Sequence, residues 1–384
     1  MATEVLGDER ALRTGRRERA LAQMEAHDLD ILVLGRQSNI RYVSGAQQLW
    51  VAGTRPFAPS CVLLRNGAVH LLSTWDEGVP EDIPHENLYG IAWNPMNTIE
   101  NLKKISGAAT ARRVGSDALS PGFAQLLPMA FPNAELVDGE PAIRAARRIK
   151  TPEEIDTLRE AIRVAEVGLA AGVAELRSGA LVQELTAVLL EAMTAGGVST
   201  PARQDAVWVT AKDHPWRRVR GDDRVHDGDL VAFASGVLDR GYIGEVGRTW
   251  PVGDLTDNPG SLRSCPPAAA TRAIFERSDR LHDRLIGACR PGAANAELLA
   301  AYEAAGEALP VVPVAHGLGV GFDSPVVSPQ LAATAAIERL EPGMVLAITG
   351  YVFEPGVGAV FRRDAVLITD DGADVLTSSP AWSA

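Results

Sequence analysis

Three residues in the second half of the chain carry side chains suited to chemistry. Glu245 offers a carboxylate, His316 an imidazole that titrates near neutral pH, and Arg363 a guanidinium that stays protonated at physiological pH. A divalent metal binds where several carboxylate oxygens or imidazoles converge. If these three side chains came together, they would favour an anion or a polar molecule over a metal, because a guanidinium donates paired hydrogen bonds to carboxylates and phosphates.

Asp323 follows His316 in a glycine-rich segment, and the two side chains are candidates for an imidazole–carboxylate pair. Such a pair would raise the pKa of the histidine and hold its tautomer. The alternative is a structural hydrogen bond from Asp323 within a tight turn. The residue pattern leaves both interpretations open.

The first part of the chain predicts an α/β domain. A strand-like run ends at Leu34, and two more, Cys61–Leu64 and Val69–Leu72, are separated by Asn66-Gly67. Asn-Gly between apolar runs is a strong signal for a β-hairpin. Helical and strand-like segments then alternate to about Val137, and we place the first domain at residues 1–147.

The second domain, residues 148–384, begins with a helix signal, because Thr151 and Pro152 are typical of a helix start. A second helix is predicted from about Leu181 to Met193. The run from Gly228 to Ala234 is similar to the run from Gly343 to Thr349, each with six residues after the glycine. Two halves related by a pseudo-twofold axis would place Ala234 and Thr349 in equivalent positions facing one cleft. Chance similarity of apolar strands is the alternative.

The chain resembles the creatinase, prolidase and methionine aminopeptidase family, which has the pita-bread fold. The resemblance is carried by Asn39-Ile-Arg-Tyr-Val-Ser-Gly45, by Arg148-Ile-Lys-Thr-Pro-Glu-Glu-Ile155, and by five later motifs: Gly228-Asp-Leu-Val231, Gly241-Tyr242, Arg248-Thr249, His316-Gly-Leu-Gly319 and Pro342-Gly-Met344. It implies an α/β (α+β) protein. A creatinase-type N-terminal domain would precede a pita-bread domain with an internal pseudo-twofold duplication.

The resemblance also implies five metal-ligand positions, and these read Ala234, Glu245, His316, Thr349 and Arg363. Ala234 has no donor atom, Thr349 stands where a glutamate is expected, and Arg363 replaces a carboxylate by a cation. We therefore expect no bound metal and no cofactor. The alternative is a register shifted by one residue at Arg363, which would bring Asp364 into the site.

Creatinase is the metal-free member of this family, and the resemblance to it implies C–N bond hydrolysis with a histidine as acid and base. Its substrate-gripping glutamate corresponds to Glu245. Its catalytic histidine would fall at Arg217, and His214 lies three residues earlier, so the candidates for the proton shuttle are His316 and His214. Its second gripping glutamate corresponds to Thr349, so we do not expect creatine itself as the substrate.

Our leading interpretation is a metal-independent, creatinase-like enzyme that performs C–N hydrolysis, or a related elimination, on a small carboxylate-bearing molecule. Glu245 would position a polar or cationic group and Arg363 would hold the anion, with Thr349 and Asp323 beside them. The alternatives are a non-catalytic protein that binds a ligand or a partner, and an Xaa-Pro dipeptidase or aminopeptidase with an unconventional metal set. Two-domain relatives also imply a homodimer in which Arg55 approaches the neighbouring subunit's cleft.

Composition limits the remaining possibilities. The net charge is −12, from 37 basic and 49 acidic residues, which argues against binding nucleic acid. We find no apolar run long enough to span a membrane, and the charged N-terminus does not resemble a signal peptide. The cysteines are far apart, so we expect no disulfide framework and a cytoplasmic protein.

Overall fold

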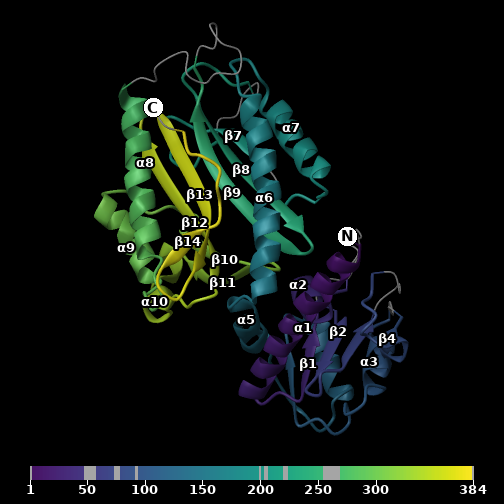
Figure 1. The fold of residues 1–384 in the computed structure, drawn as a ribbon. Helices are drawn as coiled ribbons and strands as arrows, with labels where there is room; N and C mark the ends of the chain where they lie inside the picture. The colour runs from purple at the N-terminus through teal and green to yellow at the C-terminus, as the bar shows by residue number, and fades with distance from the viewer. Residues whose placement is uncertain are drawn as a thin grey trace. The chain divides into compact units, whose positions relative to one another are not determined.

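The structure is a computed structural model that describes residues 2–46, 58–72, 78–90, 94–198, 200–202, 206–218, 224–253 and 269–382. The chain forms two compact units, Met1–Glu153 and Glu154–Ala384, called here the N-terminal and C-terminal units. Each unit contains its own β-sheet with helices packed on it (Figure 1). The predicted α/β class is confirmed.

The N-terminal unit contains a six-stranded sheet in the order β4-β3-β2-β1-β5-β6. Its strands are β1 (Ile31–Leu34), β2 (Cys61–Leu64), β3 (Val69–Leu72), β4 (Leu88–Tyr89), β5 (Arg113–Ser116) and β6 (Glu135–Asp138). Its helices are α1 (Ala2–Ala26), α2 (Gln37–Ser44), α3 (Pro95–Lys103), α4 (Pro121–Leu126) and α5 (Glu140–Arg148). The predicted hairpin is confirmed, since β2 and β3 pair antiparallel around Asn66-Gly67.

The Asn39–Gly45 motif stabilises the N-terminal unit from within. The buried Asn39 amide donates to Asp117 at 2.9 Å, and the buried Tyr42 hydroxyl donates to the carbonyl of Ala146 at 2.9 Å. Gly45 ends α2 with a φ of 72°, a left-handed conformation that glycine adopts without steric cost. These contacts give the motif a structural role within its own unit.

The C-terminal unit contains an eight-stranded sheet in the order β11-β10-β12-β13-β9-β8-β7, with β14 paired to β13. The strands are β7 (Val207–Val209), β8 (Leu230–Asp239), β9 (Tyr242–Pro251), β10 (Ala315–Leu318), β11 (Phe322–Val327), β12 (Val345–Glu354), β13 (Gly358–Ile368) and β14 (Ala373–Val375). Two long hairpins, β8–β9 and β12–β13, lie side by side, and β7 and β10 flank them in equivalent places (Figure 1). The strand order on one side of the β9–β13 junction therefore mirrors the strand order on the other side.

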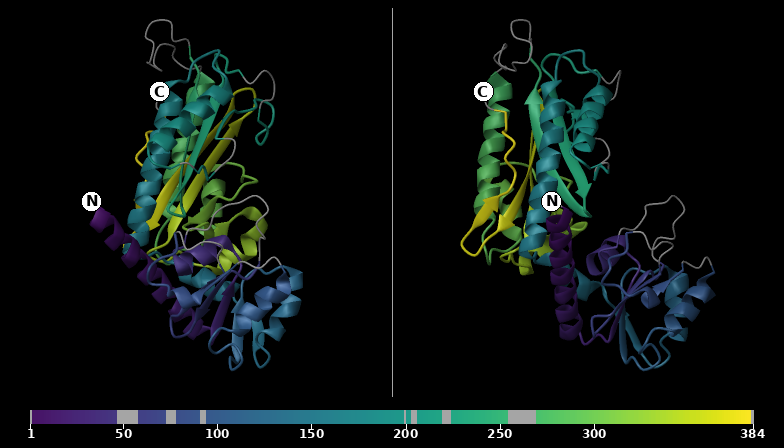
Figure 2. Two further views of the ribbon diagram at one scale, coloured as in Figure 1. Left: turned by 90° about the vertical axis from the view of Figure 1, so that its right-hand side faces the viewer. Right: turned by 45° about the vertical axis from the view of Figure 1, so that its right-hand side comes forward.

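Helices cover one face of this sheet. They are α6 (Pro152–Ala174), α7 (Val182–Ala195), α8 (Ala269–Ala288), α9 (Ala296–Ala305) and α10 (Ala332–Ile337), and Figure 2 shows α6 and α8 running alongside the strands. The first two agree with the predicted helices. α6 packs closely on β9, because a Cβ at Gly244 would lie 2.3 Å from the backbone of Ala161. Phe233 and Val246 point to this apolar helical side. The residues directly before and after these two on β8 and β9 therefore point to the opposite face of the sheet.

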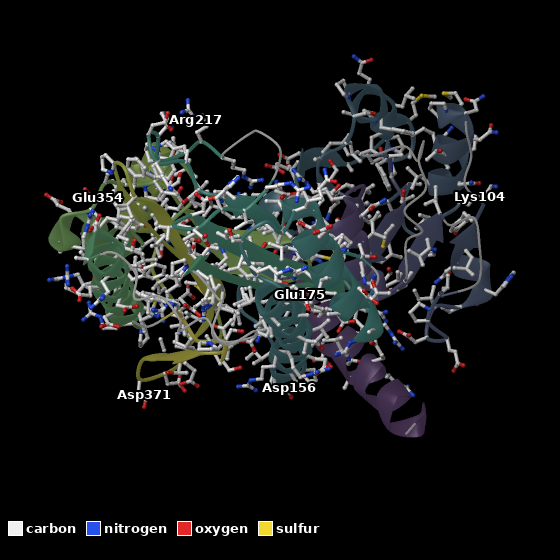
Figure 3. All side chains as sticks on the ribbon, turned by 90° about the horizontal axis from the view of Figure 1, so that it is seen from above. Lys104, Asp156, Glu175, Arg217, Glu354 and Asp371 are labelled. Atoms are coloured by element: carbon white, nitrogen blue, oxygen red, sulfur yellow. The ribbon has the colours of Figure 1, made fainter. Side chains whose placement is uncertain are left out.

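Exposed charged side chains such as Lys104, Glu175 and Asp371 lie on the outside of the units (Figure 3). Across the described residues, no helix combines the length and the apolar composition needed to cross a membrane. Cys61 and Cys289 are buried free thiols, and Cys265 falls outside the described residues.

Candidate functional site

A row of four residues crosses the centre of the C-terminal sheet. Ala234 on β8 pairs with Gly247 on β9, Gly247 pairs with Arg363 on β13, and Arg363 pairs with Thr349 on β12. Residues opposite each other on neighbouring strands point to the same face. All four therefore share the face away from α6 and α8. Ala234 and Thr349 occupy equivalent outer positions of this row, as the duplication predicts.

Arg363 and Glu245 form a buried ion pair on this face. Glu245 lies two residues before Gly247 on β9, so its side chain points the same way as the row. The Arg363 Nη1 donates to Glu245 Oε2 at 2.9 Å, and the Arg363 Nε donates to Thr349 Oγ1 at 3.0 Å. Glu245 is 0% exposed and Arg363 5%. Two residues predicted to bind a substrate's charges thus bind each other.

His316 joins the same cluster from β10. It pairs with Ala347, two residues before Thr349, so its side chain shares the face of the row. Its Nε2 lies 3.4 Å from Glu245 Oε2, the oxygen that also accepts from Arg363. On its other side, the ring of Phe322 meets the imidazole edge to face at 5.0 Å between centroids, and Phe322 is 57% exposed. His316 therefore lies between a buried carboxylate and an exposed aromatic ring.

Asp323 is buried on β11, where it pairs in register with Gly317. The ladder between β10 and β11 is irregular between His316 and Gly317. Glu245 and Phe322 are two neighbours of the His316 imidazole. The predicted His316–Asp323 pair stays a prediction.

Tyr302 on α9 fixes the backbone beneath Thr349. Its hydroxyl donates to the carbonyl of Thr349 at 2.8 Å and accepts from the amide of Tyr351 at 3.0 Å. Burial raises the pKa of Tyr302, so the phenol stays a neutral donor. The sequence did not identify this residue as part of the site. A tyrosine in an apolar helix gives the same residue pattern whether its ring packs in the core or its hydroxyl bonds to a strand.

Side chains supplement the backbone where β9 meets β13. The hydroxyl of Thr249 donates to the carbonyl of Phe361 at 3.0 Å and accepts from its amide at 2.9 Å. The Arg248 Nη1 donates to the carbonyls of Gly247 and Arg363 at 2.7 and 2.8 Å. The Arg248-Thr249 motif thus holds the strand that carries Glu245 against the strand that carries Arg363.

Asp364 anchors Arg248 on the helical face of the sheet. Its carboxylate accepts from Arg248 at 2.6 Å and from Thr377 at 2.5 Å, and the Nδ1 of His282 lies 3.5 Å away. Burial by itself raises the pKa of Asp364, but the cationic side chains around it, Arg248 first, hold that pKa below its usual value. Burial, together with the cation of Arg362, lowers the pKa of His282 to about 4.

This network decides the register that the sequence left open. Arg363 points to Glu245, whereas Asp364 points to Arg248 on the other face. The alternative in which Asp364 enters the site is wrong, because side chains alternate between the faces of a strand.

The structure brings together Glu245, His316, Thr349 and Arg363. His214 is exposed on the loop after β7, where its Nδ1 accepts from the amide of Trp216 at 3.2 Å. Its role in proton transfer stays a prediction. Arg55 lies outside the described residues.

The residues at this site do not fit a divalent metal. Within the described part of the chain, no group of three histidine, cysteine, aspartate or glutamate side chains could hold a metal ion. Glu245, the carboxylate of the cluster, is already neutralised by Arg363 at 2.9 Å. A guanidinium in that place repels a dication, since it cannot lose its proton.

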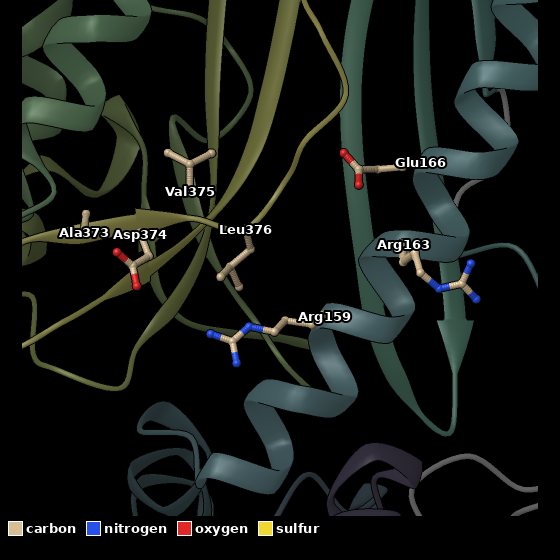
Figure 4. Close-up of a pocket in the computed structure, with 7 residues that line it drawn as sticks. All are labelled: Arg159, Arg163, Glu166, Ala373, Asp374, Val375 and Leu376. Atoms are coloured by element: carbon tan, nitrogen blue, oxygen red, sulfur yellow. The ribbon is translucent and has the colours of Figure 1, made fainter.

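A separate groove of about 590 Å³ lies between α6 and β14, lined by Arg159, Arg163, Glu166, Ala373, Asp374, Val375 and Leu376. Arg159 extends toward the β14 segment, and Arg163 points away from it (Figure 4). Both arginines are exposed and pair with acidic residues three positions earlier on α6. None of the predicted site residues lines this groove.

Comparisons with known proteins agree with this architecture. Residues 156–370 match the model of metallopeptidase family M24, and residues 16–149 match the creatinase/prolidase N-terminal domain. The fold matches the crystal structure of the prolidase from Pyrococcus horikoshii with a TM-score of 0.75 at 20% identity, covering 95% of this chain and 99% of that one. The predicted fold is confirmed.

Two sequence relatives cover nearly the whole chain. Creatinase from Bacillus sp. strain B-0618 is 25% identical, over 96% of this chain and 90% of its own length. An Xaa-Pro dipeptidase from Pyrococcus horikoshii is 24% identical, over 93% of this chain and 95% of its own length. The chain is thus similar at once to a creatinase and to a dipeptidase.

Proposed function

The chain belongs to metallopeptidase family M24, and we propose that it is a metal-independent hydrolase of a C–N bond in a small carboxylate-bearing molecule. The creatinase and the dipeptidase to which it is similar are both hydrolases. The observation that carries the proposal is the buried pair of Arg363 and Glu245, with His316 against the same carboxylate. This arrangement offers a fixed cation, an anion and an acid–base group within one cluster.

A ligand that offers both a carboxylate and an N–H donor would match the two side chains of this ion pair. A substrate carboxylate would accept hydrogen bonds from Arg363, and a substrate N–H group would donate to Glu245. A ligand with a carboxylate but no N–H donor would leave Glu245 buried and uncompensated, which is costly. The site therefore favours a molecule with a carboxylate and a polar or cationic nitrogen.

The proposed hydrolysis uses His316 as the proton shuttle. The imidazole takes a proton from water, the water oxygen bonds to the carbon, and the proton passes to the nitrogen as the C–N bond breaks. Glu245 orients the imidazole through the 3.4 Å contact. His214 is the alternative shuttle, and a related elimination is the alternative reaction.

A second candidate function is a non-catalytic binding protein. The observation in its favour is that Glu245 and Thr349 both accept hydrogen bonds from Arg363. These side chains therefore bind one another within the site. The third candidate, an Xaa-Pro dipeptidase with an unconventional metal set, is supported by the relative from Pyrococcus horikoshii. Its difficulty is the poor fit of Arg363 to a metal site.

The deciding experiment is turnover in the presence and absence of metal. Purified protein is treated with a chelator, incubated with N-acylglycines and guanidino acids, and assayed for the released amine. We expect turnover without metal, and a loss of about 10²–10⁴-fold on His316→Gln but not on His214→Gln. Turnover that appears only after Mn²⁺ is added would support the dipeptidase. Binding that requires Arg363, without turnover, would support the binding protein.

We also propose that the protein is a homodimer in which Arg55 approaches the partner subunit's cleft. The support is the similarity to two-domain relatives, which covers nearly the whole chain. Light scattering after gel filtration tests the dimer, and a monomer at micromolar concentration would contradict it. Loss of substrate affinity in Arg55→Ala, with the dimer intact, would support its role at the cleft.

A further inference from the structure

Aromatic side chains gather beside Arg363. The whole chain contains 7 tryptophans, 5 tyrosines and 8 phenylalanines, so aromatic residues are scarce. Four of them, Trp208, Trp216, Tyr351 and Phe361, contact one another in two pairs on β7, β12, β13 and the loop after β7. We call these four residues the aromatic cluster.

The register places the cluster on the face that carries the ion pair. Phe361 lies two residues before Arg363 on β13 and pairs with Tyr351 on β12. Trp208 on β7 pairs with Ala232, two residues before Ala234 on β8. Since paired residues share a face, the rings continue the row that contains Arg363.

Two rings lie between two guanidinium groups along this face. The guanidinium carbon of Arg363 lies 5.2 Å from the ring centre of Phe361, and Phe361 lies 5.5 Å from Trp208. The guanidinium carbon of Arg218 lies 4.4 Å from the ring centre of Trp208. An anion bound at Arg363 would therefore have aromatic surface next to it.

Small residues border the rings, and three of the four rings are only partly covered, while Phe361 is buried. Ala232 and Ala234 pack against Phe361, Trp208 and Tyr351. Trp208, Trp216 and Tyr351 are half-buried, which differs from the fully buried apolar core on the helical face. Rings that are half-exposed beside a polar site are typical of ligand contacts, because a pocket combines apolar surface with a few polar anchors.

The loop after β7 is attached to the cluster and would keep its rings in place. Trp216 stacks on Tyr351 at 4.7 Å between centroids, and the Tyr351 hydroxyl donates to the carbonyl of Pro215. Burial raises the pKa of Tyr351 to about 12, so its phenol stays protonated and keeps this hydrogen bond at neutral pH.

We propose that the aromatic cluster binds a flat aromatic group of the substrate, beside a carboxylate held by Arg363. The substrate class is then an aryl-bearing carboxylate with a C–N bond between the two ends. The inference rests on the proposed function for the position of the anion. The rings of Trp208 and Phe361 supply the additional specificity.

Two small probes separate the aromatic contribution from the anionic one. Hippurate carries a benzoyl ring, an amide and a carboxylate, and N-acetylglycine carries the same amide and carboxylate without the ring. Binding of both to the full chain is measured by calorimetry. We expect hippurate to bind at least tenfold more tightly than N-acetylglycine, because an aromatic contact and the apolar area that it buries both contribute to affinity.

Variants assign that difference to the cluster. Trp208→Ala should lower the affinity for hippurate about tenfold and leave the affinity for N-acetylglycine unchanged. Trp208→Phe should restore most of the lost affinity. Trp382→Ala is the matched control, because Trp382 is also half-buried but stacks on Phe275. Phe361→Leu gives a second test if Trp208→Ala does not fold.

The outcomes separate this inference from the proposed function. Equal binding of the two probes, or a hippurate affinity that does not respond to Trp208→Ala and Phe361→Leu, would overturn the aromatic subsite and leave the anion site standing. Hippurate binding that depends on Trp208 but is unchanged in Arg363→Gln would support the aromatic subsite and overturn the anion site. No binding of hippurate at millimolar concentration would overturn the inference.

Discussion

Gly247 on β9 and Arg363 on β13 face each other where the two halves of the C-terminal sheet meet. The absence of a side chain at Gly247 makes room for the neighbours of Arg363. A Cβ at this position would lie 2.2 Å from the ring of Phe361 and 3.0 Å from the Cβ of Arg363. The glycine therefore allows the guanidinium to approach Glu245 while Phe361 lies beside it.

We predict that Gly247→Ala displaces Phe361 and weakens the fold. A methyl group in a packed site costs about 1–3 kcal/mol of unfolding free energy. Urea denaturation measures this change, and Gly372→Ala is the control, since a Cβ at Gly372 would have no neighbour within 4 Å. Equal effects of the two substitutions would contradict the close packing at Gly247.

The buried pair of Arg363 and Glu245 gives a second prediction. Glu245→Gln leaves the guanidinium without its counter-charge and should lower the unfolding free energy by about 3–5 kcal/mol. The double variant Glu245→Leu with Arg363→Met removes both charges and should recover most of that loss. Chemical denaturation of Glu245→Gln, of Glu245→Leu, of Arg363→Met and of the double variant tests this. Additive losses in the double variant would mean that the two side chains are not coupled.

From His282 we predict that the free energy of unfolding depends on pH. Its pKa is lowered from 6.5 to about 4 in the folded protein, so between these values the unfolded chain binds a proton that the folded protein does not. Stability from this group is complete above about pH 6.5 and falls as the pH drops to about 4, by roughly 3 kcal/mol.

His282→Gln should flatten that part of the stability profile. His226→Gln, at an exposed histidine, is the control substitution. The measurement is urea denaturation at intervals between pH 4 and 7. An unchanged slope in His282→Gln would show that its imidazole does not titrate in this window.

Tyr302 gives a fourth prediction. Tyr302→Phe removes the hydroxyl that donates to the carbonyl of Thr349 and accepts from the amide of Tyr351. Leaving these buried backbone groups unpaired should cost about 1–3 kcal/mol. Tyr89→Phe, which removes a half-buried hydroxyl beside His70, is the comparison and should cost less. Thermal or urea unfolding distinguishes them.

The sequence by itself determined the fold and the residue types of the site. Local patterns predicted the hairpin around Asn66-Gly67 and the helix after Thr151, because turn and cap preferences act over a few residues. The motifs implied the pita-bread fold, and the family positions placed Glu245, His316, Thr349 and Arg363 in one group. The structure brings these four together.

Only the tertiary structure decided how those four residues use their charges. Arg363 meets Glu245, and Asp364 meets Arg248 on the other face, because a strand's side chains alternate and a shift of one residue would exchange the two. That register depends on pairing between β9 and β13, which lie far apart in the sequence. Tyr302 and the aromatic cluster likewise acquire their contacts through long-range packing, for which a local residue pattern gives no signal.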